Sequence, residues 1–180
     1  MTAGTVAVPG ESLALFAARA ADIGATVVQT EAERLVEVVR DLTPPDVAPG
    51  VGLTTELMEI APELDVLARG GEDYPGIVVG HGLAAIADTG QVGVADRIHR
   101  DRLRAFLAFR HVVLVSDRRV IPRLSAAGGL LATWIQSRRY VTFVGGPSRT
   151  SDIERILTVG IHGPCQLVLV LVHGWDASVD

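Results

Sequence analysis

The 180-residue sequence has no lysine and no asparagine, and its 16 basic side chains are all arginine. Without lysine, the chain has no side-chain amine for a Schiff base with a carbonyl substrate or pyridoxal phosphate. It also lacks the lysine of a Walker A loop, which excludes a standard P-loop nucleotide site. The absence of asparagine excludes N-linked glycosylation. Any anion held by this chain must therefore be bound by arginine and backbone N–H groups.

Cysteine is nearly absent, because Cys165 is the one thiol in the sequence. A single cysteine excludes an internal disulfide and an iron–sulfur cluster held by this chain, since such a cluster needs about four thiolates. We therefore expect no cofactor in this chain and a reducing compartment. The first residues lack the basic region and apolar core of a signal peptide, and the longest aliphatic run, Leu167–Val172, is too short to span a membrane. The expected location is the cytoplasm.

The net charge of −5 is unevenly distributed. Residues 1–96 contain fifteen acidic side chains and four arginines, whereas residues 97–180 contain six acidic side chains and twelve arginines. The two parts either neutralise each other within one fold or present a charged face to a partner or an anionic ligand. A homo-oligomer and a hetero-complex fit this pattern equally. Nucleic-acid binding is not expected, because the chain is acidic and no aromatic residues alternate with its arginine cluster.

Apolar runs and helical patterns alternate along the chain. Continuous apolar runs are typical of strands covered on both faces, so the pattern predicts an α/β fold with a three-layer, Rossmann-like, mostly parallel sheet. We expect one domain over 1–180, in which 1–74 form a helical lead-in with the first strand–helix elements and 75–172 form the motif-bearing core. The predicted strands are 25–29, 77–79, 91–95, 111–116, 140–144 and 166–172, and the predicted helices are 11–22, 30–41 (capped by Thr30), 54–68 in pieces, 100–109, 122–137 and 151–159.

Gly80–Ala85 matches the G-x-G-x-x-A pattern of a dinucleotide-binding turn. The next predicted strand begins at Gln91, which leaves too little chain for the crossover helix that such a site needs. We therefore interpret Gly80–Ala85 as a tight glycine turn between a strand and a short helix. His81 is then either an ordinary loop residue or a residue exposed in a pocket.

Two other segments have the residue types of an anion site. Asp88-Thr89-Gly90 places a carboxylate and a hydroxyl before a strand, and the glycine permits close backbone approach. In Gly146–Glu154, a strand end is followed by a hydroxyl-rich turn, and Ser151 and Glu154 have the spacing of a helix capping box. Free N–H groups at that helix start, together with Arg149, would bind an anion; simple capping with Arg149 in a surface salt bridge is equally consistent. The candidate anion-binding residues are Thr89, Gly90, Gly146, Ser148, Arg149, Thr150, Ser151 and Asp152.

Four segments together resemble the LUD-domain family of LutC-like lactate-utilization proteins. They are Ala85–Gly90, His111–Val115, Gly146–Glu154 and Gly160–Pro164, and the resemblance is strongest over about 75–172. The chain departs from the family at Gln91, where a small hydroxyl residue is usual, and before the His111 strand, where a Leu-Leu-Pro type of segment is usual.

The resemblance implies a fold like that of the NagB/RpiA/CoA-transferase superfamily. It also implies a role in oxidising L-lactate, or a similar 2-hydroxy acid, to pyruvate with LutA-like and LutB-like partner subunits. The LutB-like partner would carry iron–sulfur clusters. In that role Arg149 would hold the anionic group, and Asp88 or His162 would transfer a proton, since histidine titrates near neutral pH.

The sequence also permits two alternatives to a role in lactate oxidation. One is a stand-alone isomerase or CoA-transferase-like enzyme acting on a small phosphorylated or acyl-CoA substrate, because a shared fold does not determine the chemistry. The other is a binding module whose anion pocket is regulatory. A local metal site is not expected, because none of the five histidines has a partner at helical ligand spacing and the cysteine is alone.

Overall fold

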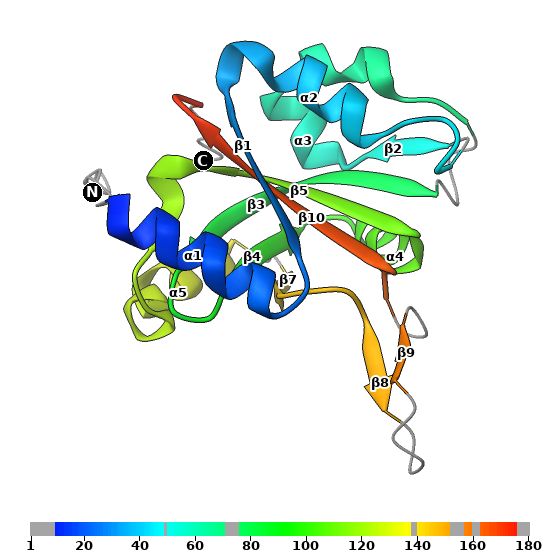
Figure 1. Cartoon of the computed structure of the whole chain (residues 1–180). Helices are drawn as coiled ribbons and strands as arrows, with labels where there is room; N and C mark the ends of the chain where they lie inside the picture. The colour runs from blue at the N-terminus through cyan, green and yellow to red at the C-terminus, as the bar shows by residue number, and fades with distance from the viewer. Residues whose placement is uncertain are drawn as a thin grey trace.

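The computed structural model describes residues 10–48, 50–70, 76–137, 140–151, 157–159 and 163–175. Its strands are β1 (Thr26–Glu31), β2 (Val51–Leu53), β3 (Ile77–Ile86), β4 (Gln91–Asp96), β5 (Arg110–Ser116), β6 (Val120–Ile121), β7 (Tyr140–Val144), β8 (Arg149–Ser151), β9 (Leu157–Val159) and β10 (Gln166–His173). The main sheet has the order β1-β10-β5-β3-β4-β7, with β2 and β6 also paired to β3 (Figure 1). In the described sheet only the β3–β4 and β4–β7 pairs are antiparallel. The expected α/β fold with a mostly parallel sheet is therefore confirmed.

Helices cover both faces of the sheet. The α-helices are α1 (Gly10–Asp22), α2 (Leu35–Leu42), α3 (Thr55–Ile60), α4 (His99–Leu107) and α5 (Gly128–Gln136), and the short 3-10 helices are η1 (Ala32–Arg34), η2 (Pro62–Leu67), η3 (Asp117–Arg119) and η4 (Leu124–Ala127). Figure 1 shows α2 and α3 on one side of the sheet and α1 on the other. Within the described ranges, no helix has the length and apolar content needed to cross a membrane.

Strand β5 shows why the apolar runs are continuous. Val112 and Leu114 belong to the core beneath α2 and α3, whereas Val113 and Val115 belong to the core that contains Phe16 of α1. Because successive side chains of a strand point to opposite faces, both sets are buried only when both faces are covered. The continuous apolar pattern is thus a direct consequence of the three layers.

Strand β3 changes its neighbour halfway along its length. Its first part, Ile77–Val79, pairs with β2, and its second part, Gly82–Ile86, pairs with β4. Strand β5 continues into β6 on the other side of β3. Strands β2 and β4 therefore both end beside Gly80 and His81, where the chain leaves the sheet on either side. We call this place the strand fork.

The prediction of a turn and a short helix at Gly80–Ala85 is wrong, because these residues lie inside β3. The glycines serve close packing between strands instead of a turn. A side chain at Gly82 would meet Val115 and Val92, each with a methyl 2.6 Å from the Cβ position. Neighbouring side chains thus occupy the space above a glycine within a fully buried strand.

The helix expected over 151–159 is also wrong. Residues 149–151 and 157–159 pair as the antiparallel strands β8 and β9, in the register Arg149↔Val159 and Ser151↔Leu157. Ser151 is the last residue of β8 and so does not begin a helix. Glu154, the other residue of the predicted capping box, lies outside the described residues. Thr30 likewise belongs to β1, and α2 begins only at Leu35, after η1. β-Branched residues in β8 and β9 favour pairing, which outweighs the local capping pattern.

Gly90, in the turn between β3 and β4, provides a test of how α1 packs against this turn. Its φ is +69°, and a Cβ there would overlap the backbone of Arg19 and Ala20 in α1. Gly90→Ala should lower the free energy of unfolding by about 2 kcal/mol or more, measured by urea denaturation. Gly129→Ala is the matched control, because open space surrounds this helical glycine, and it should stabilise α5 by about 0.5–1 kcal/mol. Equal stability of Gly90→Ala and the wild type would contradict the packing of α1 on this turn.

Candidate functional site

A cavity of about 320 Å³, which we call the Arg149 cavity, opens on the face of the sheet that α1 covers. Its volume is at the lower end of the range of small-molecule sites, roughly 300–1,000 Å³. Helix α4, the beginnings of β5 and β10, and the chain from β7 to β8 surround it. The lining residues are Val94, Arg102, Ala105, Phe106, His111, Thr142, Phe143, Val144, Gly145, Gly146, Ser148, Arg149, Gly163, Pro164 and Leu167.

Two segments far apart in the sequence form one wall of this cavity. The Ser148 N–H donates a hydrogen bond to the Pro164 carbonyl at 2.9 Å. A Cβ at Gly163 would lie 3.1 Å from the Ser148 Cβ, so the two chains are in close contact. The Gly-Pro-Ser-Arg segment and the Gly-Pro segment before β10 therefore belong to a single structural unit.

The position of Arg149 depends on the end of α1. The guanidinium lies where a side chain at Gly24 would project, and Gly24 has a φ of +90°. The cation thus stands beside the C-terminal end of a helix, which favours positive charge. The salt bridges between described residues do not include Arg149, and Asp152 and Glu154, its nearest acidic neighbours in the sequence, lie outside the described residues. Its exposed side chain is accessible to a ligand.

Arg102 supplies a second cation from α4. Its guanidinium carbon lies 4.2 Å from the centre of the Tyr140 ring, and its Nη2 lies 2.7 Å from Nδ1 of His99. The aromatic face and the imidazole both restrict the guanidinium. Because the described lining contains two arginines and no acidic side chain, the cavity favours an anionic ligand.

His111, at the beginning of β5, is the buried polar residue of the cavity, with 5% of its surface exposed. Its ring borders the cavity, and Nε2 lies 3.4 Å from the Cβ position of Gly80. Burial lowers the pKa of His111 to about 4, so the imidazole is neutral near neutral pH. From the sequence, His111 is predicted only as the first residue of a strand. The available signal was a polar residue at the start of an otherwise apolar run.

The structure separates the candidate residues into two groups. Gly146, Ser148 and Arg149 line the same cavity, whereas the lining does not include Asp88, Thr89 or Gly90. Those three belong to the turn between β3 and β4, where Asp88 Oδ1 accepts a hydrogen bond from the Leu124 N–H at 3.3 Å. The carboxylate of Asp88 is thus directed toward the first residue of η4.

The remaining candidates are less fully described. Thr150 and Ser151 belong to β8, and only their backbone is described. His162 and Asp152 lie outside the described residues. Within the described ranges, no group of three or more acidic, histidine or cysteine side chains is arranged to hold a metal ion.

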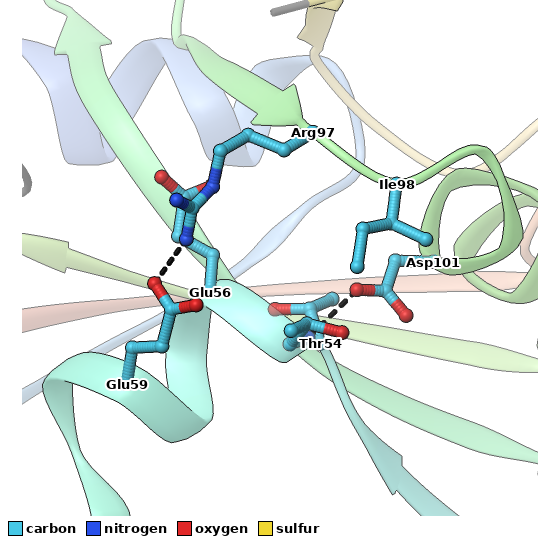
Figure 2. Close-up of a pocket in the computed structure, with 7 residues that line it drawn as sticks. Thr54, Glu56, Glu59, Arg97, Ile98 and Asp101 are labelled. Atoms are coloured by element: carbon cyan, nitrogen blue, oxygen red, sulfur yellow. Dashed lines mark hydrogen bonds and ion pairs between the residues drawn. The ribbon is translucent and has the colours of Figure 1, made fainter.

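A second cavity, of about 210 Å³, lies at the strand fork (Figure 2). It is lined by Thr54, Thr55, Glu56, Glu59, Arg97, Ile98 and Asp101. Arg97 forms an ion pair with Glu59, and the Thr55 N–H donates to Asp101 Oδ2 at 2.7 Å. Glu56 and Asp101 are each 6% exposed, so this fork cavity is acidic. Its position where strand neighbours change is typical of ligand sites in open α/β sheets. No motif in the sequence predicted this cavity.

Gly80 lies between these two cavities of opposite charge. A Cβ on this residue would be 3.2 Å from Cγ2 of Thr54, which lines the fork cavity. It would be 3.4 Å from Nε2 of His111, which lines the Arg149 cavity. The absence of a side chain at Gly80 therefore lets both residues approach the same point of β3.

The fold and the cavity define a three-layer α/β protein with a cationic small-molecule cavity. The LUD domain family matches residues 77–172, which is more than half of the chain, and the chain belongs to this family. This span includes Gly146, Ser148, Arg149 and His111, all of which line the Arg149 cavity.

The curated relatives are named Lactate utilization protein C. The protein of this name from Exiguobacterium sp. is 33% identical over 94 residues, which cover 50% of this chain and 41% of the relative. The one from Bacillus pumilus is 30% identical over 91 residues, covering 48% and 38%. The matched segments thus span about two fifths of the relatives' length.

A solved structure supports the fold. The crystal structure of a DUF162 family protein from Deinococcus radiodurans has a TM-score of 0.69 to this chain at 20% sequence identity. The superposition covers 93% of this chain and 99% of the other. The likeness therefore extends beyond the matched family segment to most of the fold.

The pKa of His111 predicts a pH-dependent stability. The imidazole takes up a proton near its ordinary pKa of 6.5 when unfolded, but only near about 4 when folded. Between these values the unfolded state binds more protons, so stability decreases as the pH falls. From about pH 7 to about pH 4.5, the wild type should lose roughly 2–3 kcal/mol more unfolding free energy than His111→Gln. Urea denaturation at both pH values measures this difference, and equal losses would contradict the burial of an uncharged ring.

Proposed function

We propose that this chain takes part in the oxidation of L-lactate, or a similar 2-hydroxy acid, and binds the carboxylate in the Arg149 cavity. The proposal rests on one observation: Arg149 and Arg102 line one cavity, and the described lining of this cavity contains no acidic residue. Membership of the LUD domain family and the name of the relatives support lactate utilization as the process.

The chemistry of the lining suits a small carboxylate with an apolar body. A planar guanidinium forms paired hydrogen bonds to the two carboxylate oxygens, and Ser148 contributes further polar atoms to the same wall. Phe106, Phe143 and Leu167 supply apolar surface, which reduces water access and strengthens the charge interaction. The cavity volume also accommodates acids longer than lactate.

The oxidation of lactate to pyruvate releases two electrons and two protons, so an electron acceptor is required. We assign this role to LutA-like and LutB-like partners, the latter with iron–sulfur clusters, because this chain has one cysteine. His162, which precedes Gly163 of the cavity wall, and Asp88, which lies outside the cavity lining, stay predicted proton-transfer groups. The single cysteine also suits the reducing cytoplasm, which we propose as the location.

Arg149→Ala tests the binding site directly. Loss of a charge-assisted contact should weaken L-lactate binding about tenfold to a hundredfold in isothermal calorimetry. Arg118→Ala is the matched control, because this exposed arginine of η3 does not line the cavity. Wild-type affinity in Arg149→Ala would refute the assignment of the carboxylate to this cavity.

A growth experiment tests the process in the cell. Deletion of the gene should abolish growth on L-lactate as the carbon source in a strain without a redundant copy. The wild-type gene should restore growth, whereas the Arg149→Ala gene should restore it only partly or not at all. Normal growth of the deletion strain would contradict a role in lactate utilization.

A ligand screen separates this proposal from the stand-alone enzyme. Thermal-shift measurements with 2-hydroxy acids, sugar phosphates and CoA esters should show stabilisation by the 2-hydroxy acids, because ligands that bind the native state raise its stability. A shift with CoA esters or sugar phosphates alone would instead favour a transferase or an isomerase.

A further inference from the structure

The walls of the Arg149 cavity are made chiefly of apolar side chains and arginines, but its buried surface includes one histidine. His111 is on the same face of β5 as Val113 and Val115, which pack into the apolar core with α1. A valine or leucine at this position would continue the apolar run without a desolvation cost. Burial of an imidazole without a hydrogen bond is unfavourable, and the His111 nitrogens do not belong to the fully enclosed, unpaired polar atoms of the described chain, because the ring borders the cavity.

A ligand in the cavity provides a hydrogen-bond partner for the ring. His111 lines the same cavity of about 320 Å³ as Arg149 and Arg102, so one small ligand is able to occupy the space that the three side chains share. A neutral imidazole has one nitrogen that donates and one that accepts a hydrogen bond. It therefore recognises a polar hydrogen-bonding group and does not require a second charge on the ligand.

We propose that His111 determines the specificity of the Arg149 cavity by accepting a hydrogen bond from the hydroxyl group next to the ligand's carboxylate. This inference rests on the proposed function for the place of the carboxylate and adds the group that distinguishes a 2-hydroxy acid from a simple carboxylic acid. The arginines give affinity for both kinds of acid, whereas His111 gives the preference for the hydroxylated one.

The test compares L-lactate with propionate, which has the same carbon chain and carboxylate but no hydroxyl group. Calorimetry on the wild-type chain should show about tenfold tighter binding of L-lactate, the value of one net hydrogen bond. In His111→Leu this preference should disappear, while propionate should bind as it does to the wild type. His111→Gln retains a side-chain acceptor and should keep part of the preference.

The propionate measurement also controls for folding, because a variant with a damaged cavity would lose both acids together. If both acids bind through Arg149 but His111→Leu keeps the wild-type preference, the role of His111 is wrong and the proposed function stands. If neither acid binds the wild type, or if Arg149→Ala binds both unchanged, the proposed function fails and the inference fails with it.

Discussion

Burial of the central strands on both faces is the constraint on which the rest of the structure depends. Every residue of β3 is buried, and β5 and β10 divide their side chains between two apolar cores. Such burial provides most of the driving force for folding, and it makes each polar group inside costly unless it is paired. His111 is conspicuous for this reason. On an exposed strand, water would hydrate the imidazole, and its position would not indicate a ligand.

The change of neighbours along β3 explains why two cavities lie close to the strand fork. Since β2 and β4 both end at the strand fork, the chain leaves the sheet there on two sides, and cavities form next to it. Gly80 allows Thr54 and His111 to approach the same point from the two cavities. The acidic fork cavity and the cationic Arg149 cavity are therefore neighbours. Acidic side chains gather in the first cavity and arginines in the second, in keeping with the uneven distribution of charge along the sequence.

The sequence predicted those features that depend on local pattern. Apolar runs located β5, β7 and β10, and the Gly146–Arg149 segment that the sequence singled out lies in the wall of the Arg149 cavity. Pairing between distant segments was not predictable in this way. The β8–β9 hairpin replaced a helix because strand pairing outweighed a capping pattern, and Gly80 lies in a long strand because of side chains on neighbouring strands. His111 was missed for the same reason, since its significance comes from a cavity formed by α4 and the chain between β7 and β8.

Arg149 connects the fold to the site. Its guanidinium occupies the space left by the missing side chain of Gly24 at the end of α1, where a cation is electrostatically favoured. In the proposed function, a carboxylate that enters the cavity meets a cation already placed beside the helix end, so less side-chain entropy is lost on binding than with a freely moving arginine. A guanidinium has several donors in one plane and is able to face a helix end and a ligand together, whereas an ammonium group is a single point charge. In a chain without lysine, the proposed anion site thus uses the side chain best suited to contact both the helix end and the ligand.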